Sequence, residues 1–349
     1  MNRSIKICAA AFLAAAIVAL VVISGLKNRT KTEYNRNTIV MGTAASFTVY
    51  ALDGDRIIDE LVSAEDTLDR DVISWRSEES ELYRLNEGYM PDTGYEVSGE
   101  LYGVISDTLA LSEESGGLLD ITIRPLSDVW GIEEGSTAIP SEESIKEAMT
   151  HVDVSKVSCY EGCVYISAPD MSIDLGAVGK GYGCDVAAKL LNESDCYGAC
   201  IALGGSIYVC GSKPDGEDWK VGVKNPRSEN GDAMGILSIP KDREAFISTS
   251  GDYEKYFIKD NVRYHHILDA KTGYPADKGV IGATVVCDNG LMSDGLSTLC
   301  MLMDIDEALM LVKKKGADVI LIDSEKNVYV SEGIRDYFTI TDDEYNIVN

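Results

Sequence analysis

A glycine-rich segment, Asp174-Leu-Gly-Ala-Val-Gly-Lys-Gly-Tyr-Gly183, has the residue types that bind a charged ligand. We expect a strand to end at Leu175 and a helix to begin near Ala177, and the four glycines would let a ligand approach the backbone closely. Such a turn directs free N–H groups toward an anion, and Lys180 adds a positive charge. The pattern is neither a Walker loop nor a GxGxxG motif, so by itself it is equally compatible with a tight packing turn.

A second segment, Met292–Met303, predicts a helix with two oxygen ligands on one face. Its apolar residues recur at helical spacing and form a core face. Asp294 and Thr298 are four residues apart, so they lie on the same side of that helix. A carboxylate and a hydroxyl suit Mg²⁺, which leaves its other positions to water and phosphate oxygens. The alternative interpretation is a capping aspartate and a surface threonine.

Two of the three histidines, His265 and His266, are adjacent in the segment Arg263–Pro275. Neighbouring residues of a strand point to opposite faces, so at most one of them should face a given site. A histidine there can take a proton from an attacking hydroxyl near neutral pH. The alternative is a hydrogen-bonded histidine in the core or at the surface. The residues that follow, Lys271-Thr-Gly-Tyr-Pro275, predict a turn.

Two further segments place glycines or hydroxyl groups beside expected strands. The glycines of Ala202-Leu-Gly-Gly-Ser206 would admit a flat ring, but glycines in such a place also mark bulges. Ser248-Thr-Ser-Gly-Asp-Tyr253 is a hydroxyl-rich turn that is ambiguous in the same way.

The elements that must position these residues indicate an α+β fold of mixed sheets with flanking helices. Several strands follow one another directly between residues 200 and 287, which disfavours a doubly wound parallel sheet. Residues 38–345 contain no internal repeat, and a single catalytic unit of one or two lobes is the simplest account of them. Apolar spacing predicts helices over 56–70, 99–114, 177–192, 292–303, 305–315 and from Ser141 on, and strands over 47–52, 164–167, 172–175, 200–210, 219–223, 244–249, 254–258, 263–268, 280–287, 318–322 and 327–330.

Residues 1–30 are expected to be a membrane anchor or a signal segment, followed by a polar tether over 31–37. Arg3 and Lys6 precede an uncharged apolar stretch, Cys8–Leu26, which as a helix would reach about 28 Å and so nearly match the hydrocarbon core. No small-residue cleavage site stands out, which favours the anchor. We therefore expect a protein of the cell membrane with an extracytoplasmic catalytic domain.

The composition bears on partners and on metals. The net charge of −27 is spread along the chain, which disfavours nucleic acid because phosphate binding needs a basic stripe. Nine cysteines leave disulfides open, with Cys159 and Cys163 or Cys196 and Cys200 as conceivable pairs. Small buried thiols are favoured for most of them, and we expect no structural metal at cysteine.

Taken together and in this order, the segments resemble the ApbE family, the FAD:protein FMN transferases. Seven blocks in register, from about residue 38 to beyond 300, are a specific signal, whereas one alone would be weak. The matching blocks are Met41-Gly-Thr43, Gly117-Leu-Leu-Asp-Ile-Thr-Ile-Arg-Pro-Leu126, Asp174–Gly181, Ala202–Gly205, Ser248–Tyr253, His266–Asp269 with Thr272-Gly273, and Ser293–Thr298.

The resemblance implies Mg²⁺-dependent transfer of FMN from FAD to a threonine or serine hydroxyl of an acceptor protein, with release of AMP. Acceptors in this family are exported or membrane-bound electron-transfer proteins, which agrees with an anchor. Two alternatives stay open: an FAD diphosphatase, with water as the acceptor, and a flavin-binding protein without turnover.

The resemblance also implies residue roles. Asp294, Thr298 and the backbone carbonyl of Ala177 would hold the metal, and His266 would be the candidate base for the acceptor hydroxyl. Contacts to FAD would come from Met41, Trp75, Leu118, Leu119 and Asp120 around the flavin, from Asp174 and Lys180 near the diphosphate and adenosine, and from Ile267.

Three positions depart from the family pattern. Cys8 lies too early to be the lipoprotein cysteine that many relatives carry. Leu119 stands where the family often has Phe, which puts the flavin packing in doubt. Ala270 replaces a usual proline, which loosens that turn without removing a functional group.

Overall fold

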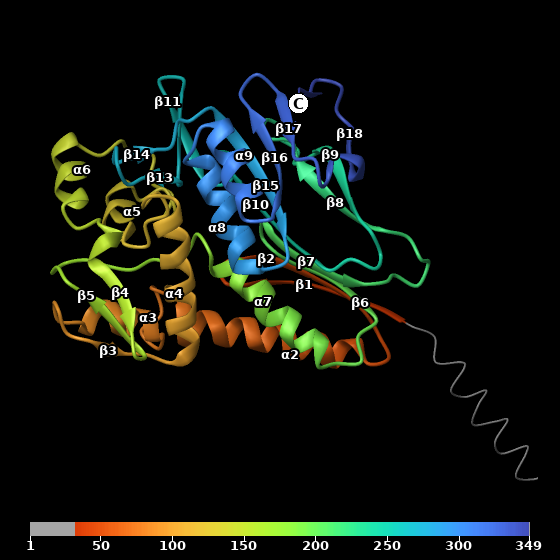
Figure 1. Ribbon diagram of the computed structural model, residues 1–349, viewed down its shortest axis with the longest axis horizontal. Coiled ribbons are helices and arrows are strands. Elements are labelled where there is room, and N and C mark those ends of the chain that lie inside the picture. Colours follow the sequence, from red (N-terminus) through yellow and green to blue (C-terminus); the bar gives the residue numbers. More distant parts are fainter. Residues whose placement is uncertain (1–31, 349) are drawn as a thin grey trace, which may run out of the picture.

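The computed structural model describes residues 32–348, and a large sheet organises them (Figure 1). Its nine strands follow the order β1-β2-β6-β7-β10-β15-β16-β17-β19, and all neighbours are antiparallel except β17 and β19. These strands are β1 (Thr32–Val40), β2 (Thr43–Ala51), β6 (Gly198–Leu203), β7 (Ser206–Gly211), β10 (Ala245–Gly251), β15 (Val280–Cys287), β16 (Asp318–Asp323), β17 (Asn327–Val330) and β19 (Asn346–Ile347).

The two faces of this sheet are covered differently, because alternate residues of a strand point to opposite sides. Val286 and Ile320 pack on one side against a small sheet, whereas Val285 and Val319 pack on the other side among helices. The small sheet contains β8 (Trp219–Lys224), β9 (Ala233–Ile239) and β18 (Phe338–Ile340). The helices are α2 (Gly54–Thr67), α7 (Gly179–Asn192), α8 (Gly290–Met301) and α9 (Ile305–Lys314).

A second lobe, at the left of Figure 1, is built mainly from residues between α2 and α7. Val104 and Ile105 of this lobe share one core with Leu296 and Leu299 of α8, so the two lobes are packed together. Its elements are α3 (Glu81–Gly88), α4 (Gly99–Glu114), α5 (Arg124–Trp130), α6 (Glu142–Met149), β3 (Tyr95–Glu96), β4 (Val157–Tyr160) and β5 (Cys163–Ile166).

Two short hairpins pack on the second lobe. Phe257 and Leu268 contribute to a core cluster with Leu126 and Trp130, and the Trp130 indole donates a hydrogen bond to the Gly273 carbonyl at 2.8 Å. The hairpins are β11 (Tyr256–Lys259) with β12 (Val262–His265), and β13 (Leu268–Asp269) with β14 (Tyr274–Pro275).

The predicted α+β class is confirmed, and the helix over 99–114 and the strand over 280–287 have the predicted bounds. Several expectations were wrong. The strands expected over 200–210 and 263–268 are each interrupted and form β6 with β7 and β12 with β13. Residues 32–37 are not a tether but part of β1, which pairs with β2 along its whole length. Residues 172–175 form no strand, because the Asp174 N–H bonds to the Ile121 carbonyl and the Ile173 N–H to the Asn86 side chain.

The predicted anchor or signal segment, residues 1–30, lies outside the described residues. Within 32–348, no helix combines the length and apolarity needed to cross a bilayer. The eight cysteines of this range are free thiols, including both conceivable pairs.

Candidate active site

A cavity of about 340 Å³ lies where the two lobes and the β11–β12 hairpin meet. Its wall includes residues from α7, α8, the segment 118–123 and the turn between β1 and β2. Every residue to which the family resemblance assigns a role lines this one cavity: Met41, Trp75, Leu118, Leu119, Asp120, Asp174, Ala177, Lys180, His266, Ile267, Asp294 and Thr298.

The glycine-rich segment turns into α7 at the cavity wall. Asp174 Oδ1 accepts the Gly176 N–H at 2.7 Å, which fixes the start of the turn, and burial raises the pKa of this carboxyl. Lys180 Nζ lies 3.3 Å from the Gly176 carbonyl oxygen and 3.8 Å from Asp294 Oδ2. The turn thus places the ammonium group of Lys180 beside the backbone of the glycine-rich segment at the cavity wall.

Helix α8 presents Asp294 and Thr298 to the same cavity. Asp294 is only 3% exposed, and its Oδ2 accepts the Gly181 N–H at 2.9 Å. The hydroxyl of Thr298 lies 3.3 Å from the Ser250 hydroxyl. The first turn of α8 is held by Asp185, whose two carboxylate oxygens accept the N–H groups of the first two helical residues at 2.7 and 2.8 Å.

These oxygens fit a hard divalent cation. Asp294 Oδ1 accepts no hydrogen bond within residues 32–348, so one carboxylate oxygen stays available beside the Thr298 hydroxyl. Ala177, the third predicted ligand, lies on the same wall. In the described part of the chain, no group of three His, Cys, Asp or Glu residues could hold a metal. A metal here would therefore depend on hydroxyl, carbonyl and substrate oxygens, a donor set that suits Mg²⁺.

His266 follows β12 and lines the cavity, whereas its neighbour does not. Its N–H donates to the Lys255 carbonyl at 3.1 Å, and its Nδ1 is buried without a partner in the described chain. Burial lowers the pKa of His266 to about 4, against the opposing field of Glu133, so the ring is neutral at pH 7. His265 is buried elsewhere, with Nε2 at 2.9 Å from the Ala276 carbonyl. The prediction that at most one of the two faces the site is confirmed.

The expected flavin side of the cavity begins after a π-helix, Leu68–Ile73, that extends α2. π-Helical turns occur frequently at functional sites. Trp75 follows this turn, and the guanidinium groups of Arg76 and Arg124 lie 3.6 and 2.9 Å from the centre of its ring. Cations over an indole face are attracted to its π-system and hold it in place.

Asp120 lines the cavity, but both of its carboxylate oxygens accept hydrogen bonds from neighbouring residues. Oδ1 accepts the N–H and the hydroxyl of Thr122 at 2.7 and 2.5 Å, and Oδ2 accepts the Val154 N–H at 3.0 Å. Burial raises the pKa of Asp120. This carboxylate therefore holds the 118–123 segment in shape.

Five charged cavity residues escaped the sequence analysis, and three of them, Arg76, Glu133 and Lys255, form one ion-paired group. Glu133 Oε2 lies 2.9 Å from Arg76 Nη2, and its Oε1 lies 3.3 Å from Lys255 Nζ. Although burial favours the neutral form, Lys255 and Arg76 hold the pKa of Glu133 below its usual range. Arg76, Glu133 and Lys255 come from three separate segments of the chain, so their spacing in the sequence could not have revealed that they meet. The ambiguous glycine and hydroxyl segments also reach the wall, through Gly204, Gly205, Thr249 and Ser250.

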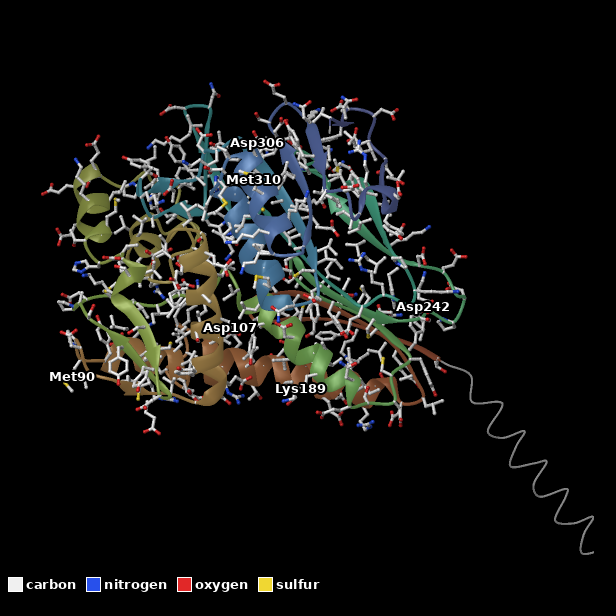
Figure 2. The ribbon with its side chains drawn as sticks, viewed as in Figure 1. Met90, Asp107, Lys189, Asp242, Asp306 and Met310 are labelled. Atoms are coloured by element: carbon white, nitrogen blue, oxygen red, sulfur yellow. The ribbon has the colours of Figure 1, made fainter. Side chains whose placement is uncertain are left out.

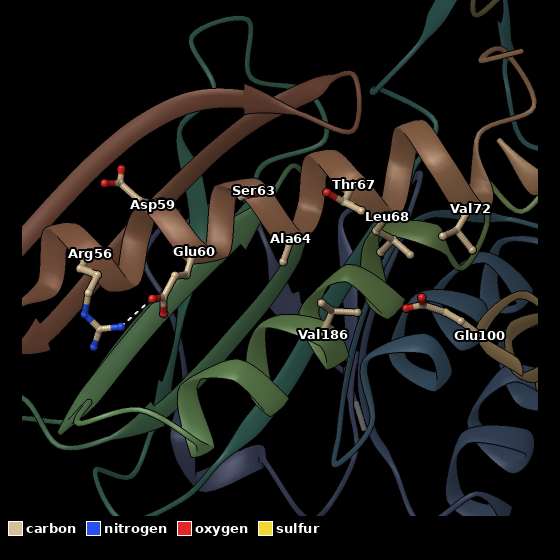
Figure 3. A pocket seen from close by; sticks show the side chains of 10 residues that line it. All are labelled: Arg56, Asp59, Glu60, Ser63, Ala64, Thr67, Leu68, Val72, Glu100 and Val186. Carbon is tan, nitrogen blue, oxygen red and sulfur yellow. Dashed lines mark hydrogen bonds and ion pairs between the residues drawn. The ribbon is translucent and has the colours of Figure 1, made fainter. Parts of the chain in front are cut away.

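A second depression runs along α2 and is open to solvent (Figure 3). Its Arg56 and Glu60 form an ion pair at 2.6 Å, one helical turn apart. None of the residues predicted from the sequence lines it. The chemical groups therefore converge on the first cavity and not on this one.

Known proteins resemble this chain over most of its length. The model of the ApbE family matches residues 41–321. The FAD:protein FMN transferase of Treponema pallidum (strain Nichols) is 29% identical, with 89% of this chain and 90% of the relative covered. The FAD:protein FMN transferase of Vibrio cholerae (strain O395) is 27% identical, with 88% and 87% covered.

Solved structures resemble it equally broadly. The crystal structure of the ApbE protein of Thermotoga maritima has a TM-score of 0.78 and 28% identity, with 88% of this chain and 99% of that chain covered. The flavin transferase ApbE of Vibrio cholerae, at 24% identity and the same TM-score, shows the same fold. Family model, relatives and fold agree, and the chain belongs to the ApbE family.

Proposed function

We propose that this protein transfers the FMN half of FAD to a threonine or serine hydroxyl of an acceptor protein and releases AMP. Relatives called FAD:protein FMN transferases support the transfer. The observation that carries the proposal is the single cavity in which Asp294, Thr298, the glycine-rich turn and His266 meet.

In the proposed reaction, the acceptor oxygen attacks the FMN phosphorus and forms a phosphoester. The bond from that phosphorus to the bridging oxygen breaks, and AMP leaves with the electron pair. The proton of the acceptor hydroxyl passes to His266, which is neutral at pH 7 and can accept it. Phosphoryl transfer of this kind depends on positioning and on neutralising charge rather than on a covalent intermediate with the enzyme.

Positive charge must be supplied locally, because the chain as a whole carries −27 and repels a diphosphate. Lys180, Arg76 and Lys255 line the cavity, but Glu133 pairs with Arg76 and Lys255, so these cations supply only part of the charge that is needed. Asp294, Thr298 and the Ala177 carbonyl would hold Mg²⁺, which supplies further charge neutralisation to the diphosphate.

The proposal extends to where the protein works. The uncharged apolar stretch Cys8–Leu26 supports attachment to the cell membrane with the catalytic domain on the extracytoplasmic side. The acceptor would then be an exported or membrane-bound electron-transfer protein.

The test is incubation of the full chain with FAD, Mg²⁺ and the flavin-acceptor domain of an exported electron-transfer protein, followed by intact mass analysis. A gain of one FMN on the acceptor, together with free AMP, is expected. Free FMN with AMP and an unmodified acceptor would indicate an FAD diphosphatase instead. Bound and unchanged FAD would indicate a flavin carrier, and either result would overturn the proposal.

A further inference from the structure

Exposed apolar side chains gather on the hairpins next to the cavity. Tyr256, Ile258 and Val262 of the β11–β12 hairpin are 44%, 59% and 49% exposed, and Tyr274 of β14 is 37% exposed. Elsewhere in the described chain, such residues are scattered over separate elements. Single exposed apolar residues are normal, whereas neighbouring ones on one feature mark an interaction surface.

The β11–β12 hairpin connects this apolar surface to the cavity. Lys255 and His266 flank its two strands, line the cavity and are joined by the backbone hydrogen bond of 3.1 Å. From this base, the hairpin projects away from the body of the molecule (Figure 1). It forms a sheet of two strands, so both outer edges lack a partner strand within residues 32–348. A free edge of this kind can accept an added extended strand.

The same stretch is less acidic than the chain as a whole, although Lys255, Arg263 and Lys278 pair with Glu133, Asp252 and Asp269. Residues 255–278 contain five lysines or arginines and three aspartates, in a chain whose net charge is −27. Lys259 is exposed on β11. An acidic partner segment would be repelled less here than elsewhere on the surface, and Lys259 offers it a local contact of opposite charge.

The chemistry of the transfer requires a protein to reach this place. A threonine or serine hydroxyl is one bond beyond Cβ, so the acceptor backbone must pass close to His266 to present it. The hairpin joins the cavity at His266 and projects into solvent, and it offers apolar side chains, free backbone groups and the exposed Lys259.

We propose that the β11–β12 hairpin is the docking surface for the acceptor, which adds an extended segment along a free edge of the hairpin. The register places Tyr256 and Ile258 on one face of the hairpin and Lys259 with Val262 on the other. Apolar side chains on one face of the added segment would contact Tyr256 and Ile258, and side chains on its other face, acidic and apolar, would lie near Lys259 and Val262. This inference rests on the proposed function and names the partner surface of the same site.

A double variant, Ile258→Ser with Val262→Ser, tests the apolar contact. With the acceptor domain used above, the KM for the acceptor should rise about tenfold, while kcat stays within about twofold and the Kd for FAD is unchanged. The matched control is Met310→Ser, which removes a 64% exposed apolar side chain from α9 (Figure 2) and should leave all three values unchanged. An unchanged acceptor KM in the double variant would overturn the inference.

Lys259→Glu tests the charge. It should raise the acceptor KM several-fold at low salt and weaken the dependence of that KM on ionic strength. An acceptor KM that is equal to wild type at low salt would contradict the charged contact. Loss of FAD binding in either hairpin variant would show that the hairpin shapes the cavity and would also overturn docking. Wild-type protein that leaves the acceptor unmodified refutes the proposed function itself, and this result is seen before any variant is compared.

Discussion

His266 and Glu65 show at the residue scale how burial sets protonation. Both are surrounded by protein, and both have ring or carboxyl atoms without a hydrogen-bond partner in the described chain. Burial disfavours the charged form in each case, so it lowers the pKa of the histidine and raises that of the glutamate. His266 is therefore a neutral base at pH 7, and Glu65 is a protonated carboxylic acid in the core over most of the pH range below 8.

The pH dependence of the transfer should report the pKa of His266. Because burial lowers that pKa to about 4, kcat/KM for FMN transfer should rise through the acid range and level off by about pH 6. A pH profile of kcat/KM checks this. His266→Ala should slow the transfer by about 10²–10⁴-fold while FAD affinity changes little. A rise centred near 6.5 would contradict the lowered pKa of His266, and equal losses of transfer and FAD binding would contradict its role as a base.

Glu65 predicts a pH-dependent stability. Burial raises its pKa in the folded state to about 8, above the ordinary 4.5 of the unfolded chain. The folded state therefore binds the proton more tightly, and the stability from this group is fully present below pH 4.5 and is lost as the pH rises toward 8. The slope is at most about 1.4 kcal/mol per pH unit.

Glu65→Gln should remove that slope and raise the free energy of unfolding at pH 8 relative to the wild type. Urea unfolding of both proteins between pH 5 and pH 8 measures this. Glu60→Gln is the matched control on the same helix, because Glu60 is exposed and forms only a surface ion pair with Arg56. A wild-type slope that survives in Glu65→Gln would contradict the assignment.

Side chains on one regular element were predictable, and side chains from several elements were not. Asp294 and Thr298 were found because a helix brings residues four apart to one face. Arg76, Glu133 and Lys255 meet only through the tertiary fold. Glu65 was missed for another reason: it occupies a position on the apolar stripe of α2, four residues after Leu61, where the pattern predicts an apolar residue.

At the element scale, the contact between α7 and α8 places the predicted metal ligand. Gly181 and Gly290 lie in close contact, and a Cβ on Gly181 would stand 2.6 Å from the Asp294 Cβ. This spacing lets the Gly181 N–H bond to Asp294 Oδ2. Gly181 therefore serves helix packing, and this role is compatible with the proposed contact between the segment and a ligand.

Gly181→Ala should drive α7 and α8 apart. The added methyl group meets the Gly290 backbone, which cannot move aside by rotating a side chain, so the free energy of unfolding should fall by about 1–3 kcal/mol. The matched control is Gly103→Ala in α4, where a Cβ meets no atom within 4 Å and helix propensity should add about 0.5–1 kcal/mol. Denaturant unfolding measures both, and equal stabilities would contradict the packing argument.

The elements themselves were predictable where the apolar pattern and the hydrogen bonds agree. Residues 171–175 alternate between buried and half-buried positions as a strand would, but their hydrogen bonds go to a loop carbonyl and to the Asn86 side chain. β1 is mostly exposed, so its sequence shows little apolar alternation. Its pairing with β2 is a contact of the folded chain that its own sequence does not reveal. Strand order within the sheet has no local signature either.

At the scale of the whole molecule, the cavity lies where two lobes share a core, in a protein whose exterior is acidic. Asp107, Asp242 and Asp306 lie on different parts of that exterior (Figure 2). The chain's net charge of −27 makes binding of a diphosphate unfavourable unless cations are concentrated at the site. Lys180, Arg76 and Lys255 supply part of this positive charge. The negative charge that they leave uncompensated explains why the proposed reaction should require a divalent metal.

The most direct test of the account measures AMP release from FAD, with the acceptor domain present, as a function of Mg²⁺ concentration. Wild-type protein and an Asp306→Asn control should show the same saturable activation by Mg²⁺. Asp294→Asn keeps the shape of the side chain and removes its charge, so activity should fall by at least about 10³-fold at physiological Mg²⁺. Full activity of Asp294→Asn there, or AMP release that is independent of Mg²⁺ in the wild type, would contradict the metal site on which the proposed mechanism depends.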